Sequence, residues 1–91
     1  NNLWLYEMMG MDPKWAYFVR RLRELKERFD VVDMRLLARY MKKFSGYQEL
    51  IDYVERAVVA GYLVPTTRVR GKEDLYKVQF QITVPEWGEE A

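Results

Sequence analysis

Neither cysteine nor histidine occurs in the sequence, and Ser45 is its single serine. A Ser–His or Cys–His nucleophile cannot be assembled from these residues, and a zinc site built from cysteine or histidine ligands is excluded as well. The lack of cysteine also excludes disulfide bonds, which favours an intracellular location. We expect that location to be the cytoplasm for a prokaryotic or viral source, with the nucleus as the alternative for a eukaryotic one.

Glycine is scarce and scattered. The five glycines stand singly, so no Gly-rich loop for a phosphate group is present. No apolar stretch approaches the roughly 20 residues that a membrane-spanning helix needs, and the first residues lack the basic segment of a signal peptide. The adjacent acids Glu73 and Asp74 come nearest to a carboxylate pair, but such acids are common in turns. We therefore expect no enzymatic activity, no metal or other cofactor, no small-molecule ligand and no membrane association.

The composition is that of one small folded domain. Of the 91 residues, 49% are hydrophobic and 15% are aromatic, too many for a disordered chain. A chain of this length has room for one modest core. The formal net charge is only +1, so an interaction with nucleic acid has to depend on where the charges lie and not on their sum.

Three stretches show the hydrophobic spacing of amphipathic helices. Asp12 followed by Pro13 is typical of an N-cap with proline at the first helical position, and Asp33 is a second N-cap. Gly61 is placed to end the last helix in a left-handed conformation. The predicted helices cover about residues 13–29, 34–44 and 47–60.

After Gly61 the apolar residues alternate with polar ones, which indicates strands. We predict one strand over 62–70, a turn at 71–74 and a second strand over 75–84. The short segment 30–32 is expected to add to an edge of this sheet. In the second predicted strand the inward positions are Tyr76, Val78, Phe80, Ile82 and Val84.

The order helix, short strand, helix, turn, helix, hairpin resembles the winged helix-turn-helix family over residues 13–84. Residues 47–63 look like that family's third helix running into the first wing strand, and 68–72 resemble a wing tip. The resemblance implies an α+β fold with three helices followed by a two-stranded β-hairpin wing, in the order H1-S1-H2-H3-S2-wing-S3. The predicted organisation is an apolar extension at 1–11, a winged-helix domain at 12–84 and an acidic tail at 85–91.

The family resemblance also implies a mode of DNA binding, in which the third helix enters the major groove and the wing contacts the backbone. The expected outward positions of the third helix here carry three acids and one base, which departs from that pattern. Each acid is repelled by phosphate, and phosphate neutralisation supplies much of the affinity for DNA. These outward residues are Gln48, Glu49, Asp52, Glu55, Arg56 and Val59.

Positive charge is concentrated elsewhere in the chain. Residues 13–45 hold ten Lys or Arg and four Asp or Glu. On the first helix most bases have an acid nearby, which indicates an ion-paired solvated face. The bases of the second helix have no acid between them, and three more follow in the wing, although basic residues there also protect sheet edges. The predicted phosphate contacts are Arg35, Arg39, Lys42 and Lys43 on the second helix and Arg68, Arg70 and Lys72 on the wing.

Three functions follow from these patterns. The first is binding of double-stranded DNA by the second helix and the wing, in transcription regulation or replication. The second is protein docking, in which Glu49, Asp52 and Glu55 face a basic partner while the apolar Leu3, Trp4 and Leu5 mediate self-association as a homodimer. The third is binding of single-stranded nucleic acid or RNA, with Tyr17 and Tyr53 as surface stacking residues.

Overall fold

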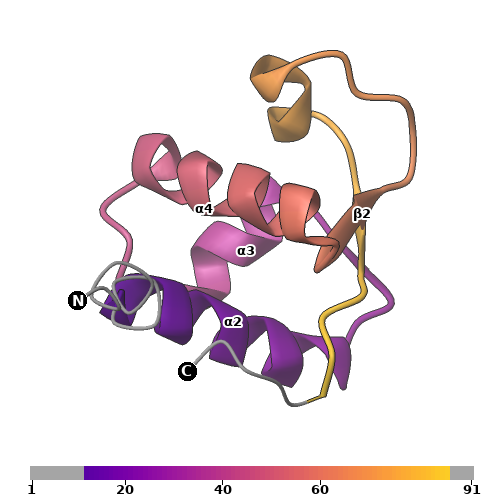
Figure 1. The fold of residues 1–91 in the computed structure, drawn as a ribbon. Coiled ribbons are helices and arrows are strands. Elements are labelled where there is room, and N and C mark those ends of the chain that lie inside the picture. Colours follow the sequence, from indigo (N-terminus) through magenta and orange to yellow (C-terminus); the bar gives the residue numbers. More distant parts are fainter. Residues whose placement is uncertain (1–11, 87–91) are drawn as a thin grey trace, which may run out of the picture.

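The structure, a computed structural model, describes residues 12–86 of the chain (Figure 1). The predicted apolar extension, with Leu3, Trp4 and Leu5, lies outside the described residues, as does most of the acidic tail. Three helices, a three-stranded antiparallel sheet and a 3₁₀ helix form an α+β domain with the predicted element order. The elements are α2 (Pro13–Lys26), β1 (Val31–Val32), α3 (Met34–Tyr40), α4 (Tyr47–Ala60), β2 (Leu63–Pro65), η1 (Lys72–Tyr76) and β3 (Phe80–Ile82).

Both predicted N-caps are confirmed, but the first two helices end earlier than predicted. The Asp12 carboxylate accepts hydrogen bonds from the backbone N–H groups of Lys14 and Trp15, at 3.1 and 3.2 Å. Helix α2 stops at Lys26, because the following residues close a tighter turn in which the Arg28 N–H donates to the Leu25 carbonyl, three residues back. The prediction of a helix to about residue 29 was therefore too long.

Helix α3 is a short helix held at both ends by side chains. The Asp33 carboxylate caps its start by accepting from the Leu36 N–H at 2.9 Å. At its end the Arg21 guanidinium, which comes from α2, donates twice to the Tyr40 carbonyl, at 3.0 and 2.8 Å. This contact supplies hydrogen-bond donors to a terminal carbonyl that would otherwise accept from a backbone N–H of a further helical turn. Helix α3 consequently ends at Tyr40 and not near residue 44, so Lys42 lies in the following turn.

Helix α4 has the predicted bounds and ends in a Schellman motif. Gly61 adopts a φ of 84°, and its N–H donates to the Val58 carbonyl while the Tyr62 N–H donates to the Ala57 carbonyl. The left-handed residue turns the chain directly into β2. The prediction of a glycine C-cap at this position is confirmed.

Replacing Gly61 by alanine is expected to lower the free energy of unfolding by about 1–2 kcal/mol. A Cβ at this position would meet no atom within 4 Å, so the cost comes from the left-handed backbone alone. Gly61→Asn should cost less, since asparagine tolerates this conformation. Urea denaturation measures both, with Gly71→Ala as the control because Gly71 has an extended backbone and equally open surroundings. Equal losses for Ala and Asn would contradict this explanation.

The sheet has the strand order β1-β3-β2, with β3 in the middle. Gln81 of β3 pairs with Val31 on one side and with Val64 on the other. The edge strand predicted at 30–32 is thereby confirmed over Val31–Val32. Phe80 and Ile82 are buried, while Gln81 faces solvent. In Figure 1 the sheet lies beside the C-terminal ends of α2 and α4.

The segment between β2 and β3 differs from the predicted long hairpin. Strand pairing stops soon after Pro65, and the hydrogen bond from the Thr66 N–H to the Gln79 carbonyl, 2.8 Å, closes the segment at its base. In place of a turn the chain forms η1, which packs against α4. The physical reason is Leu75: strict alternation would have exposed it, and the 3₁₀ helix buries it in the core and turns Tyr76 outward.

The core is entirely apolar among the described residues: it contains no buried polar or charged residue. Its members come from α2, α3, α4, all three strands and η1, and they form one continuous cluster. None of the helices in residues 12–86 is long and apolar enough to cross a membrane. Every charged residue of the described part of the chain is therefore at least partly exposed, and its internal contacts decide whether its charge is free to bind a partner.

Candidate nucleic-acid interface

Two arginines stand one helical turn apart on the outer face of α3. Arg35 and Arg39 are both exposed, and neither guanidinium makes a hydrogen bond or ion pair with any described residue. The nearest acid in the sequence, Asp33, is occupied by its capping bond to Leu36. Lys42 is exposed in the turn after α3 and is likewise without an ion pair in the described part of the chain. Three of the predicted phosphate contacts thus carry uncompensated charge.

The same face of α3 borders three adjoining hollows, which we call the α3 groove. Arg39 and Lys42 line the first hollow, and Arg39 is shared with the second, which Arg35 also lines. The third hollow shares Arg35 and extends to residues 76–79, after η1. The unpaired bases therefore line three neighbouring hollows that share lining residues. The residues lining the first two hollows are Tyr17, Arg21, Asp33, Arg35, Leu36, Arg39, Tyr40 and Lys42.

Lys43 takes a different direction from the other bases of this region. Its ammonium nitrogen lies 5.0 Å from the centre of the Tyr17 ring, which also carries the Arg20 guanidinium at 5.8 Å. The predicted alignment of Lys43 with Arg35 and Arg39 required a longer helix, and α3 ends before it. A cation–π contact leaves the charge of Lys43 intact but orients it toward α2.

The predicted wing bases fall into two groups. Arg68 and Arg70 are exposed in the loop after β2 and form no ion pair with the residues described. The prediction that both project from one side of a strand was wrong, because no strand forms there. Lys72 is different: its ammonium donates to the Asp52 carboxylate and lies 3.8 Å from Glu55. The hydrogen bond to Asp52 raises the pKa of Lys72.

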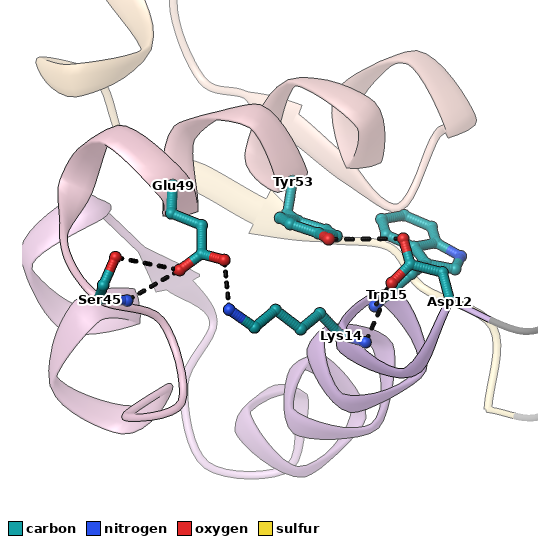
Figure 2. A network of polar contacts seen from close by, with 6 residues as sticks. All are labelled: Asp12, Lys14, Trp15, Ser45, Glu49 and Tyr53. Carbon is teal, nitrogen blue, oxygen red and sulfur yellow. Dashed lines mark hydrogen bonds and ion pairs between the residues drawn. The ribbon is translucent and has the colours of Figure 1, made fainter.

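The acids of α4 are also paired within the domain. Figure 2 shows Glu49 between the Lys14 ammonium and Ser45, whose N–H and hydroxyl donate to it at 2.9 and 3.2 Å. Lys14 and then the Ser45 amide lower the pKa of Glu49. Asp52 and Glu55 share Lys72. The three acids predicted to face a basic partner thus each have a basic neighbour of their own.

The network in Figure 2 fixes the start of α2 against α4. Besides capping α2, Asp12 accepts from the Tyr53 hydroxyl at 3.4 Å and pairs with Arg56 at 3.4 Å. The Tyr53 ring packs on Trp15 and Phe18, and burial, followed by the Asp12 charge, raises its pKa. Tyr53 is accordingly an internal link, and its ring is occupied by neighbouring rings.

Replacing Glu49 by glutamine is expected to make stability less dependent on pH in acid. Because the folded-state pKa of Glu49 lies below its ordinary value of 4.5, its contribution is present above that value and is lost as the pH falls through the folded-state pKa. Wild type and Glu49→Gln should differ in the free energy of unfolding at neutral pH and converge well below pH 4.5. Urea denaturation over a pH series measures this, with Glu73→Gln as a control. A difference that stays constant with pH would contradict the prediction.

Two exposed tyrosines and one lysine at the third hollow were not identified from the sequence. Tyr47 is 43% exposed, and Tyr76, which was predicted to point inward, is 38% exposed. Their rings lie 6.3 Å apart, centre to centre, at 19° to each other. Lys77 lines the same hollow. The sequence feature that could have indicated the exposure of Tyr76 is its neighbour Leu75. Alternation along a strand turns only one of two adjacent large residues inward.

No family model, curated protein or solved structure matches this chain. Its element order and sheet topology are winged-helix-like. Residues 12–86 contain no group of three or more acids, histidines or cysteines placed to hold a metal ion. The surface feature with the clearest chemical character is the α3 groove, where positive charge is exposed and unpaired.

Proposed function

We propose that this chain is a non-enzymatic winged-helix domain that binds double-stranded DNA through the first two hollows of the α3 groove and the loop after β2. The observation that carries the proposal is the unpaired state of Arg35 and Arg39 on one exposed face, next to Lys42. Cations without an internal partner are the groups that gain most from phosphate, because binding releases counterions at no cost in broken ion pairs. Such contacts suit a role in transcription regulation or replication.

The arrangement of α3 supports a duplex as the partner. In helix-turn-helix proteins the helix before the recognition helix crosses the DNA backbone, which is the position that α3 would take here. Arg68 and Arg70, in the loop after β2, supply further phosphate contacts in this proposal. The acids of α4 oppose it less than their number indicates, since Lys14 and Lys72 offset them.

Charge reversal on α3 tests the proposal. The double variant Arg35→Glu/Arg39→Glu is expected to bind a labelled random-sequence duplex about 100-fold more weakly than wild type. The reason is that each lost charged contact weakens the affinity by about tenfold. Fluorescence anisotropy at low salt measures the affinity. The matched control is Arg23→Glu/Lys26→Glu, which changes the charge equally and lies at a hollow that shares no residue with the α3 groove. Circular dichroism verifies that both variants fold.

Two outcomes would contradict duplex binding through this face. One is a wild-type protein that does not bind the duplex even at low salt, which would favour the protein-docking alternative. The other is an equal loss of affinity in the two double variants, which would show that only the total charge matters.

A further inference from the structure

The third hollow of the α3 groove combines a pair of exposed tyrosine rings with a lysine unpaired among the described residues, and the proposed duplex contacts use neither. Tyr47 begins α4 and Tyr76 ends η1, and their side chains form an exposed, nearly parallel pair of rings. Neither hydroxyl makes a hydrogen bond within the described residues. We call this pair the tyrosine platform. Most other aromatic rings of residues 12–86 are buried or partly buried in the core, so the platform is not needed to fill it.

The surroundings of the tyrosine platform have the chemistry of a nucleotide site. The hollow has a volume of about 450 Å³, within the range of ligand-sized pockets. Arg35 and Lys77 line it and have no ion pair among the described residues, and the exposed Gln79 also lines it. One acid, Asp33, lines it as well, with its carboxylate engaged in the capping bond to the Leu36 N–H. Flat rings beside unpaired cations are the combination that single-strand binders use, with the rings for bases and the cations for phosphates.

An exposed ring pair can stack only on a base whose face is free. Inside a duplex each base face is covered by the next base pair, and a blunt end has no unpaired strand whose phosphate Lys77 could hold. The partner therefore has to be an unpaired base beside the duplex. Arg35 lines both the second and the third hollow, and the tyrosine platform therefore adjoins the surface proposed for the duplex. A single DNA molecule with a junction between a paired and an unpaired segment can contact both the tyrosine platform and the duplex surface.

We propose that the tyrosine platform binds an unpaired DNA base next to a duplex, so that the domain prefers duplexes with a single-stranded overhang. This proposal rests on the proposed duplex binding and adds the class of DNA structure that is recognised. Stacking on Tyr47 and Tyr76 supplies the preference, while Lys77 holds a phosphate of the unpaired strand. Arg35, which lines both hollows, keeps its duplex phosphate at the junction.

The experiment compares three labelled probes with the full chain by fluorescence anisotropy: a blunt duplex, the same duplex with an overhang of about five nucleotides, and the overhang strand alone. Wild type is expected to bind the overhang duplex about tenfold more tightly than the blunt one, the scale of one base stacked on an aromatic ring. Tyr47→Ala/Tyr76→Ala should lose this preference and keep its affinity for the blunt duplex. Tyr47→Phe/Tyr76→Phe should retain it, because the rings remain.

The outcomes separate the two proposals. Equal wild-type affinity for blunt and overhang duplexes would overturn the tyrosine platform while leaving duplex binding in place. This comparison uses the wild-type protein alone, so it does not depend on whether a variant folds. Preference retained in the alanine variant would overturn it as well. If the blunt duplex is not bound but the single strand is, and the alanine variant weakens that binding, duplex binding fails and the preference for an overhang duplex fails with it. Only the stacking of an unpaired base on the tyrosine platform is then supported. Binding to none of the probes overturns both.

Discussion

Raising the salt concentration from about 50 mM to about 200 mM is expected to weaken wild-type binding to a random duplex by about 500-fold. Each phosphate contact with a cation contributes about −0.9 to the slope of log affinity against log salt, and five contacts give a slope of about −4.5. Lys72 is left out of this number because its charge is paired with α4, and Lys43 because it is oriented toward Tyr17. The five contributing residues are Arg35, Arg39, Lys42, Arg68 and Arg70.

Anisotropy titrations at a series of salt concentrations measure this slope. The variant Arg35→Glu/Arg39→Glu should flatten it by about two contacts, whereas the control Arg23→Glu/Lys26→Glu should leave it unchanged. A wild-type affinity that barely responds to salt would contradict binding through phosphate. A steeper slope, close to that of seven contacts, would show that Lys43 and Lys72 leave their internal partners on binding.

Replacing Phe18 by alanine is expected to lower the free energy of unfolding by about 3–5 kcal/mol. Phe18 is fully buried, and its ring is stacked on Trp15 at 5.7 Å and meets Phe44 edge-on at 6.0 Å. The ring of Tyr53 is 6.1 Å away, so one residue joins α2, α4 and the turn between α3 and α4. Its removal leaves a cavity that none of these elements can fill without moving.

Urea denaturation followed by circular dichroism measures the effect of Phe18→Ala. The control is Val59→Ala, since Val59 is 82% exposed and its loss should change the free energy of unfolding by less than about 0.5 kcal/mol. Small domains are stable by about 5–15 kcal/mol, so the expected loss is a large share of the total. A loss below about 1 kcal/mol would mean that Phe18 is not the centre of this core.

Local signals predicted most of the helical part of the fold. Asp12, Asp33 and Gly61 act through contacts within a few residues of themselves, and each one caps the helix it was expected to cap. The end of α3 was not predictable in this way, because the cap at Tyr40 comes from Arg21, nineteen residues away. The hairpin was predicted too long for a related reason: Leu75 is buried by packing against distant elements, and that competes with alternation along the strand.

The same distinction between local and long-range contacts decides which features of the candidate site were predictable from the sequence. Helical spacing was enough to place Arg35 and Arg39 on one face of α3. The pairing of Lys72 with Asp52 joins η1 to α4 across twenty positions, and no spacing rule indicates it. Sequence patterns therefore located the free bases of α3 but not the charges that cancel each other, nor the exposed state of Tyr47 and Tyr76.

The two side-chain caps of α3 have a consequence for the thermodynamics of recognition. A helix of seven residues has little stability by itself, so α3 owes its shape to Asp33 at one end and Arg21 at the other, together with the burial of Leu37. These contacts exist before any partner arrives, so the backbone that carries Arg35 and Arg39 is already ordered and loses little conformational entropy on association. Binding is then opposed mainly by the ordering of side chains, and the encounter rate is set by long-range attraction, not by a folding step.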